Sequence, residues 1–289
     1  MTTGESGNIR KIVPHCTICG NDNQFTSTKA TILSTFLTSL IHCQSCDFEW
    51  FSGANDWLDK AYQNPIADTD TGIVRRNMEL HQILSSLFVL GASTSKFLDW
   101  GSGSGLLVRM LRDDGLDCIG FEPFTEPVLA PGFTYKQERV VRSKGPFHCV
   151  IAIEVVEHLL SPVEFFQSAL SLADTIIFTT ELTDSKTQGE NWWYYSKDTG
   201  QHISFYSRKS LKLIAASFGA SYQHTRGQSL HMITRDQRQA KLFKLACGIH
   251  RSKIIYMAIK TWQSLSRRPK SLIMQDHLDA KNRLKSPIN

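Results

Sequence analysis

Four cysteines near the amino terminus stand in two closely spaced pairs. Cys16 and Cys19 form the first pair, and Cys43 and Cys46 form the second after 23 intervening residues. Each pair places two thiolates on one tight turn, and two such turns make the tetrahedral four-cysteine site that zinc prefers. A closed site of four thiolates leaves no open coordination position, so we expect structural zinc rather than catalytic zinc. Free or redox-active cysteines are the alternative interpretation.

A glycine-rich turn follows the apolar residues Phe97 and Leu98. It combines an acid with small residues that let a ligand approach the backbone closely, namely Asp99, Gly101, Ser102, Gly103 and Gly105. A dinucleotide fingerprint would require glycine at position 106, where Leu106 stands. A second acid, Glu122, ends the next expected strand, where acids commonly accept hydrogen bonds from ribose hydroxyls. The pattern therefore predicts a site for a ligand that carries a ribose.

Two carboxylates and an imidazole follow the strand expected around residues 147–153. If a helical turn begins there, Glu154, Glu157 and His158 lie at i, i+3 and i+4 on one face. Such a face can bind a divalent cation, and His202 downstream offers a fourth ligand. Two alternatives stay open for His158. It is a general base or a substrate-orienting group in one, and a packed structural residue in the other.

The residues between these motifs alternate strand and helix. Short β-prone segments at 97–98, 117–121, 147–153 and 175–179 are separated by helical patterns at 106–111, 162 onward and 207–218, and a hairpin is expected around residues 222 and 231–234. Ser161 and Glu164 are expected to form a capping box. Alternation of this kind predicts an α/β fold with a doubly wound, mainly parallel seven-stranded sheet.

The sequence resembles the class I S-adenosylmethionine-dependent methyltransferases through this context and these motifs. The resemblance implies that Asp99 and the glycines of the turn hold the methionine part of the cofactor and that Glu122 holds its ribose. Glu154 is also counted among the cofactor-binding residues. The acid that contacts adenine in this family has no evident counterpart near residues 137–140.

Two metal-using groups of the same superfamily are similar to this sequence around the Glu-x-x-Glu-His run. They are the ubiquinone-pathway O-methyltransferases and the small-RNA 2′-O-methyltransferases. Carried over from them, a catalytic Mg²⁺ or Mn²⁺ is bound by Glu154, Glu157, His158 and His202. Glu157 and His158 are then the expected catalytic residues, since a metal lowers the pKa of an acceptor hydroxyl. Many metal-free methyltransferases also carry a Glu-His pair after this strand.

Charge is unevenly distributed along the 289 residues, whose net charge is +5. From Arg235 to the end, thirteen Lys or Arg stand against three Asp. We therefore divide the chain into a zinc-ribbon module (1–55), a linking helical segment (56–95), a cofactor-binding domain (96–235) and a basic helical extension (236–289). The extension fits an anionic membrane surface, a phosphorylated carrier or nucleic acid, and an ordinary packed helix with a solvated face is the alternative.

An aromatic run at residues 192–195 is expected above the cofactor methyl group. Its rings either stack on an acceptor or form a lid that packs on the sheet. The run from Gly200 to Leu211 resembles a broad subgroup of small-molecule methyltransferases, some of which carry an amino-terminal zinc module and act on sugars. The resemblance implies that the acceptor is a hydroxyl on a sugar or glycan precursor, or on another small molecule. An RNA methyltransferase and a non-catalytic binding module are the rival functions, and nucleic acid is the less favoured partner.

Composition and the absence of targeting patterns indicate the class of protein and its cellular location. Apolar residues make up 41% of the chain, which excludes a disordered, collagen-like or disulfide-stapled protein. The three remaining cysteines, Cys118, Cys149 and Cys247, suit a packed core. No signal-peptide pattern precedes Cys16, and the longest uncharged run contains Ser, Thr and two of the paired cysteines. We therefore expect a soluble cytoplasmic protein.

Overall fold

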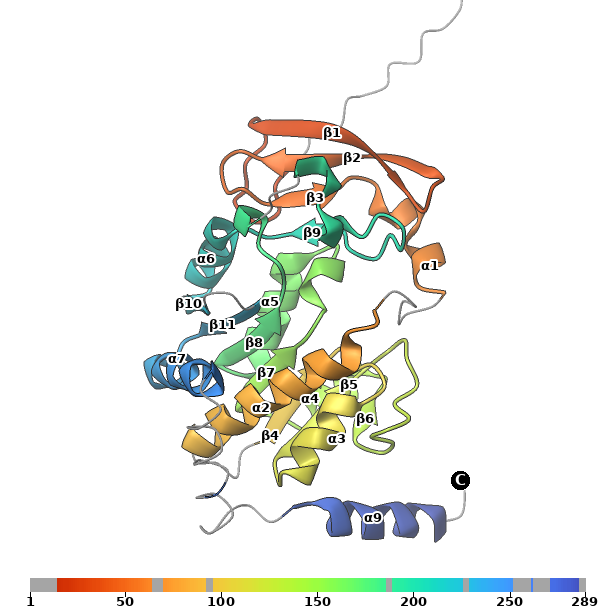
Figure 1. The fold of residues 1–289 in the computed structure, drawn as a ribbon, viewed down its shortest axis with the longest axis vertical. Helices are drawn as coiled ribbons and strands as arrows, with labels where there is room; N and C mark the ends of the chain where they lie inside the picture. The colour runs from red at the N-terminus through yellow and green to blue at the C-terminus, as the bar shows by residue number, and fades with distance from the viewer. Residues whose placement is uncertain are drawn as a thin grey trace, which may run out of the picture.

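The computed structural model describes residues 15–63, 70–91, 96–185, 189–225, 229–251, 261 and 271–285. Two sheets lie one above the other along the long axis of the molecule (Figure 1). The smaller sheet has the order β1-β2-β3-β9 and the larger has the order β10-β11-β8-β7-β4-β5-β6. No helix among the described residues is long and apolar enough to span a bilayer.

The larger sheet is parallel except for one strand. Its members are β4 (Lys96–Trp100), β5 (Asp117–Phe121), β6 (Thr134–Tyr135), β7 (Cys149–Ala152), β8 (Thr175–Thr179), β10 (Ser221–His224) and β11 (Leu230–Thr234). Strand β11 runs antiparallel to both β8 and β10, so the expected hairpin is confirmed. The strand order reverses between β4 and β7, and this switch point lies below the glycine-rich turn.

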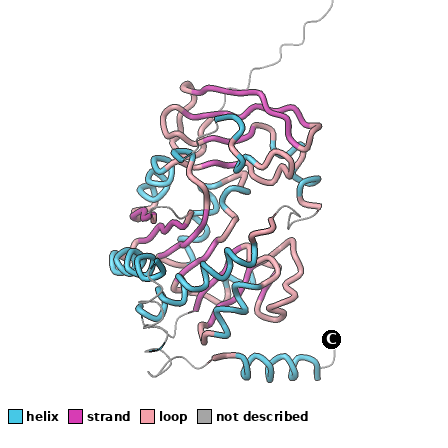
Figure 2. The backbone as a smooth tube through the Cα atoms, in the orientation of Figure 1, coloured by secondary structure: helices cyan, strands magenta, loops and turns pink. Residues whose placement is uncertain are grey.

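Helices cover both faces of the larger sheet (Figure 2). One face packs against α2 (Ile73–Gly91), α3 (Leu106–Asp113) and α7 (Gln237–Arg251). The other packs against α4 (Glu138–Arg142), α5 (Pro162–Leu172) and α6 (Arg208–Ser217). Alternate strand residues serve the two faces: Val150 and Ile176 face one core, while Ile151 and Ile177 face the other. The doubly wound α/β fold is thereby confirmed.

The observed helix starts agree only partly with those predicted from the sequence. Ser207 caps α6 and forms a reciprocal capping box with Ser210. The capping box expected at Ser161 and Glu164 is wrong, because no side-chain cap bond forms at the start of α5. Pro162, which suits the first turn without a donor, begins that helix instead.

The smaller sheet joins the amino-terminal module to the larger domain. It consists of β1 (Phe25–Ile32), β2 (Phe36–Cys43), β3 (Glu49–Phe51) and β9 (Ser204–Phe205), and the short α1 (Leu58–Ala61) follows it. Strand β9 comes from a segment more than 150 residues further along the chain and pairs antiparallel with β3. The module therefore shares a strand with the domain that carries the glycine-rich turn.

The linking segment and the basic extension are both packed where the structure describes them. Helix α2 lies against α3 and α7, so it forms part of the cover of the sheet. On α7, Phe243 and Ala246 are buried while Lys241 and Lys244 are exposed. Helix α9 (Ile273–Lys285) follows. The basic residues Lys253, Lys260, Arg267, Arg268 and Lys270 lie outside the described residues.

Candidate active site and metal centres

The four paired cysteines converge at one end of the smaller sheet. One ligand atom from each lies within 4.8 Å of the others, and Sγ atoms of Cys16 and Cys46 are 3.5 Å apart. A tetrahedral zinc with Zn–S bonds of about 2.3 Å separates its sulfurs by about 3.8 Å. Asp47 closes the second turn with a left-handed backbone at φ 57°. The predicted group of four cysteines is confirmed, and its geometry fits zinc.

The glycine-rich turn connects β4 to α3 through three left-handed backbones. Gly101, Gly103 and Gly105 have φ angles of 79°, 52° and 81°. A Cβ on Gly101 would lie 2.6 Å from Cγ2 of Val155, so only glycine lets the turn approach the segment after β7. Ser102 is buried within the same turn.

Glu122 fastens the end of β5 to that turn. Its Oε2 accepts from the amide of Gly103 at 2.9 Å, and its Oε1 accepts from the amides of Phe124 and Thr125. Asp99 is only 2% exposed at the end of β4. Burial, and next the charge of Glu122, raises the pKa of Asp99 to about 7. The structure thus brings the predicted cofactor residues of β4 and β5 together.

Glu157, His158 and His202 form a second cluster of ligand atoms. One atom from each lies within 4.8 Å of the other two. Nδ1 of His158 bonds to the carbonyl of Gln201 at 3.0 Å, and Nδ1 of His202 bonds to the carbonyl of Tyr194 at 2.7 Å. A carbonyl only accepts, so each Nδ1 carries the proton and each Nε2 keeps its lone pair.

Burial dominates the electrostatics of this second cluster. It lowers the pKa of His158 to about 3 and that of His202 to about 4, so both rings are neutral near pH 7. It also raises the pKa of Glu157 well above its usual range. Oε2 of Glu157 is buried without a hydrogen-bond partner among the described residues. Two imidazole lone pairs and an unpartnered carboxylate oxygen are a donor set that suits a divalent cation.

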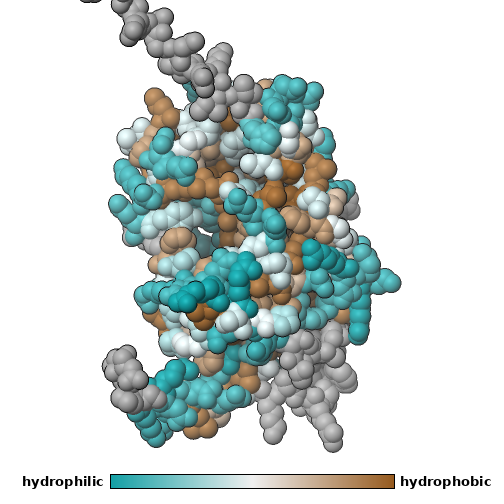
Figure 3. Space-filling model, turned by 180° about the vertical axis from the view of Figure 1, so that it is seen from behind, coloured by the Kyte–Doolittle hydropathy of each residue, from teal (hydrophilic) through white to brown (hydrophobic). Residues whose placement is uncertain are grey.

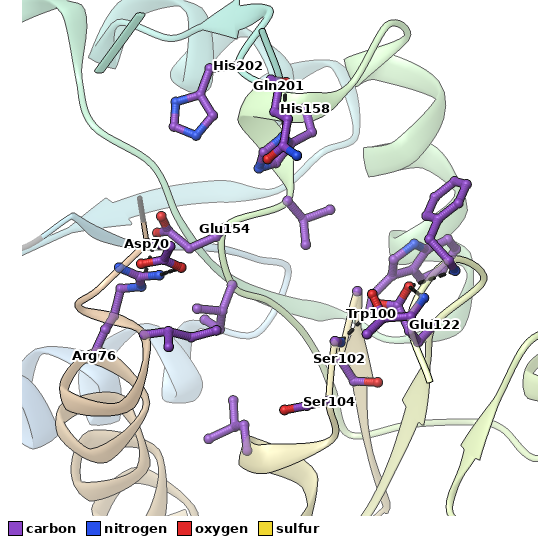
Figure 4. A pocket seen from close by; sticks show the side chains of 18 of the residues that line it. Asp70, Arg76, Trp100, Ser102, Ser104, Glu122, Glu154, His158, Gln201 and His202 are labelled. Atoms are coloured by element: carbon purple, nitrogen blue, oxygen red, sulfur yellow. Dashed lines mark hydrogen bonds and ion pairs between the residues drawn. The ribbon is translucent and has the colours of Figure 1, made fainter. Parts of the chain in front are cut away.

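Glu154 does not share a helical face with Glu157 and His158, so that expectation is wrong. Its backbone is left-handed at φ 55°, and the short 3₁₀ helix η2 (Val156–His158) begins only two residues later. Its Oε1 accepts from Oγ1 of Thr179 at 2.8 Å and lies 3.9 Å from Nε of Arg76. Figure 4 shows this carboxylate beside Arg76 and Asp70, away from the two histidines.

A cavity of about 610 Å³ connects the two groups of residues. Asp99, Glu122 and the glycine-rich turn line one end, and His158 and His202 line the other. The space-filling view from behind shows the molecule hollowed between its upper module and its lower part (Figure 3). Such a volume is typical of small-molecule sites.

A family model described as a methyltransferase domain matches residues 74–225 of this chain. That range is more than half of the 289 residues. The chain belongs to the methyltransferase domain family. The match confirms the resemblance to class I S-adenosylmethionine-dependent methyltransferases that was drawn from Asp99–Gly105 and Glu122.

Relatives of this chain include the human mitochondrial ubiquinone biosynthesis O-methyltransferase, which is 28% identical over 44% of the chain and 42% of that protein. The chain thus spans less than half the length of this relative. Similar solved structures include magnesium protoporphyrin IX methyltransferase from Synechocystis PCC 6803 with bound SAH, which has 19% identity and a TM-score of 0.44 and covers 64% of this chain and 95% of its own.

Another similar structure is the 1,6-didemethyltoxoflavin-N1-methyltransferase from Burkholderia thailandensis. It is 12% identical, with a TM-score of 0.47, and covers 68% of this chain and 94% of its own. At these identities the similarity extends no further than the fold.

Sequence reasoning missed two residues of the candidate site. Tyr194 belongs to the noted aromatic run, but no pattern indicated that its hydroxyl would donate to Oε1 of Glu157 at 2.7 Å. Arg76 on α2 lines the cavity, and its Nη2 donates to Oδ2 of Asp70 at 2.7 Å. The only available signal was its spacing of four residues from Leu80 and seven from Ile83, which places a cation on the inward face of this helix.

Proposed function

We propose that this chain is an S-adenosylmethionine-dependent O-methyltransferase that acts on a hydroxyl of a small molecule. The observation that carries the proposal is one cavity that runs from Glu122 and the glycine-rich turn to His158 and His202, behind which the buried Glu157 completes the cluster of ligand atoms. Methyl transfer from a sulfonium needs mainly alignment of the acceptor oxygen with the methyl group. One cavity that holds both partners supplies this alignment.

The cofactor lies, in this proposal, at the end of the cavity formed by β4 and β5. Glu122 accepts hydrogen bonds from ribose hydroxyls, while Asp99 faces the ammonium group of the methionine part. The backbone amides of the turn already donate to Phe121, Glu122 and Ser102. What the glycines supply is therefore a backbone without side chains, which the cofactor can approach closely.

Arg76 holds the carboxylate of the methionine part. Among the described residues that line the cavity, it is the sole Lys or Arg. Its guanidinium lies between Asp70 and Glu154, which fix its position. Glu154 therefore serves the cofactor by orienting Arg76 rather than by binding a metal.

A Mg²⁺ or Mn²⁺ ion is held by Glu157, His158 and His202 in this proposal. The donor set fits, because both Nε2 lone pairs and the unpartnered Oε2 of Glu157 belong to one cluster. Such an ion, when bound, lowers the pKa of an acceptor hydroxyl that it contacts. The carbonyls of Gln201 and Tyr194 fix the histidine tautomers.

The acceptor is a phenolic or sugar hydroxyl. The rings of Tyr62, Phe124 and Trp193 line the cavity, and Phe124 and Trp193 are 69% and 68% exposed. Exposed rings suit stacking on an aromatic or sugar ring. The relative named as a ubiquinone biosynthesis O-methyltransferase favours oxygen as the methylated atom, and none of the named relatives acts on a sugar, so the phenolic class comes first.

The test measures formation of S-adenosylhomocysteine by the zinc-loaded protein. The probes are caffeic acid as a catechol, uridine diphosphate glucose as a sugar and a short single-stranded RNA, each with and without Mg²⁺ or Mn²⁺. We expect turnover of the catechol or the sugar that stops with a chelator and returns with either ion. Turnover insensitive to the chelator would instead support His158 as a general base. Turnover of the RNA alone would contradict a small-molecule acceptor, and cofactor binding without turnover on any probe would favour the binding module.

A further inference from the structure

The segment 195–207 lies between the cavity and the zinc-bearing module, here defined as residues 15–61. It carries Gln201 and His202, which both line the cavity. Within residues 15–61, no described side chain lines the cavity. The module therefore contacts the site through the segment, and Tyr62, the residue directly after the module, lies with its ring centroid 6.2 Å from that of His158.

Residues of the module hold the segment along most of its length. The backbone amide of Leu33 donates to the carbonyl of Lys197 at 2.9 Å. Nε1 of Trp57 donates to the carbonyl of Gly200 at 2.9 Å. Nε2 of Gln201 donates to the carbonyl of Ala61, also at 2.9 Å. His202 thus follows directly after two residues that the module fixes.

The other side of His202 is fixed as well. The amide of Phe51 donates to the carbonyl of Ile203 at 3.0 Å, and the amide of Ile203 donates to the carbonyl of Glu157 at 2.8 Å. Ile203 therefore connects β3 directly to the backbone of Glu157. Beyond it, β9 pairs with β3 in the smaller sheet.

One side-chain bond ties the segment to a cysteine of the zinc site, and a second ties it to the strand residues beside that site. The hydroxyl of Ser207 donates to the carbonyl of Cys46 at 2.8 Å. The phenol of Tyr195 donates to Oε2 of Glu49 at 2.6 Å, and Oε1 of that glutamate lies 3.1 Å from Nδ1 of His42, the residue before Cys43. Glu49 is only 3% exposed, so its bond to Tyr195 forms away from water.

The cofactor end of the cavity is built differently. The glycine-rich turn is held by the carboxylate of Glu122 and by the amide-to-carbonyl bond from Gly101 to Phe121. These bonds join β4, β5 and the start of α3, which lie within the larger sheet domain. The two ends of the cavity therefore depend on different parts of the chain.

We propose that the zinc-bearing module is a positioning element for the acceptor end of the site. Zinc at the four cysteines orders β2 and β3, these strands order the segment 195–207, and the segment places His202 against Glu157 and His158. Cofactor binding does not depend on the zinc-induced ordering of this segment. The proposal rests on the proposed function for its divalent-ion readout, but its exchange readout is independent of any activity.

Hydrogen exchange of the full chain, zinc-loaded and zinc-stripped without other divalent ions, gives the first test. Removal of zinc is expected to raise exchange at least tenfold in amides of 195–207 and to leave amides of 97–105 protected. Unchanged protection of 195–207 after zinc removal would overturn the proposal. If both regions lose protection because the chain unfolds, the proposal is tested instead with zinc-loaded variants of the full chain.

Tyr195→Phe removes the bond to Glu49, and Trp57→Phe removes the bond to Gly200 while keeping a ring in place. Each is expected to weaken Mn²⁺ binding about tenfold, as outer-sphere changes do, with cofactor affinity within twofold of wild type. Leu37→Ser is the control, because Leu37 belongs to the same module and is 87% exposed. Unchanged Mn²⁺ affinity in both variants would refute the positioning role. A wild type that binds neither cofactor nor Mn²⁺ would refute the proposed function, while exchange would still decide this inference.

Discussion

The phenol of Tyr194 donates a 2.7 Å hydrogen bond to Oε1 of Glu157, and both side chains are almost fully buried. The same tyrosine accepts from Nδ1 of His202 through its main-chain carbonyl. One residue of the aromatic run therefore orients two members of the three-residue cluster. It does so from opposite ends, with its hydroxyl on the carboxylate and its backbone on the imidazole.

Tyr194→Phe keeps the backbone bond to His202 and removes only the bond to Glu157. We expect Mn²⁺ affinity to fall about tenfold, because the carboxylate loses the donor that fixes one of its oxygens. Calorimetric titration of the zinc-loaded protein with Mn²⁺ measures this. Cofactor affinity is expected to stay within twofold, so an equal loss of both affinities would point to general damage to the fold.

Much of the larger domain was predictable, because local sequence determines it. The strands at 117–121 and 175–179, the helix capped by Ser207 and the hairpin at β10 and β11 follow from β-branched runs, capping chemistry and glycine stops. The cysteine pairs were predictable for the same reason, since two ligands sit on each short turn. The proximity of the glycine-rich turn to Glu122 was predictable as well, because β4 and β5 are neighbouring parallel strands and their carboxyl ends lie side by side.

Predictions from the sequence failed where the structure depends on contacts between residues far apart in the chain. Glu154 was expected beside Glu157, but its left-handed backbone turns the carboxylate toward Thr179 and Arg76. The pairing of β9 with β3 joins residues more than 150 positions apart, and no local pattern encodes it. The division of the chain at residue 55 rested on local sequence, so it did not predict that the amino-terminal module contacts the segment that carries His202.

Arg76 is expected to recognise the carboxylate of the methionine part. The wild type should therefore bind S-adenosylmethionine more tightly than decarboxylated S-adenosylmethionine, by about tenfold, since a charged partner is lost. Arg76→Gln is expected to abolish this preference. Arg75→Gln is the matched control, because Arg75 lies on the same helix with its side chain 86% exposed. A preference that persists in Arg76→Gln would place the carboxylate elsewhere.

Cofactor binding is expected to release protons near neutral pH. Asp99 has a pKa raised to about 7 by burial and by Glu122, and the buried Cys118 thiol near it stays protonated because burial raises its pKa. About half of Asp99 is then protonated at pH 7, and a cationic ligand favours its ionised form. Affinity should therefore rise from pH 6 to pH 8.

Calorimetry at pH 7 in buffers with different ionisation enthalpies counts the protons released. We expect about half a proton from Asp99. Asp99→Asn, which cannot ionise, should bind more weakly and lose this contribution. The assignment of Asp99 fails if the variant releases as many protons as the wild type.

The basic extension contains a buried ion pair that argues for a structural role of α9. Asp276, 4% exposed, accepts from Nε and Nη2 of Arg112 at 2.8 and 2.7 Å, and Arg109 lies 2.9 Å away. Burial opposes the charge of Asp276, but the hydrogen bonds and charges of the two arginines outweigh it and lower its pKa. The guanidinium of Arg112 also lies over the ring of Phe133 at 3.8 Å.

Asp276→Asn leaves Arg112 and Arg109 without their shared carboxylate, so the free energy of unfolding should fall by about 3 kcal/mol. Urea denaturation at pH 7 measures it, and Asp279→Asn on the same helix should stay close to wild type. Because the folded pKa of Asp276 is lowered, its contribution is present above the unfolded value of about 3.9 and lost as pH falls through the folded value. The unfolding free energies of variant and wild type should therefore begin to converge below about pH 4 and become equal only below the lowered folded pKa of Asp276. A variant as stable as wild type at pH 7 would show that α9 is held by other contacts.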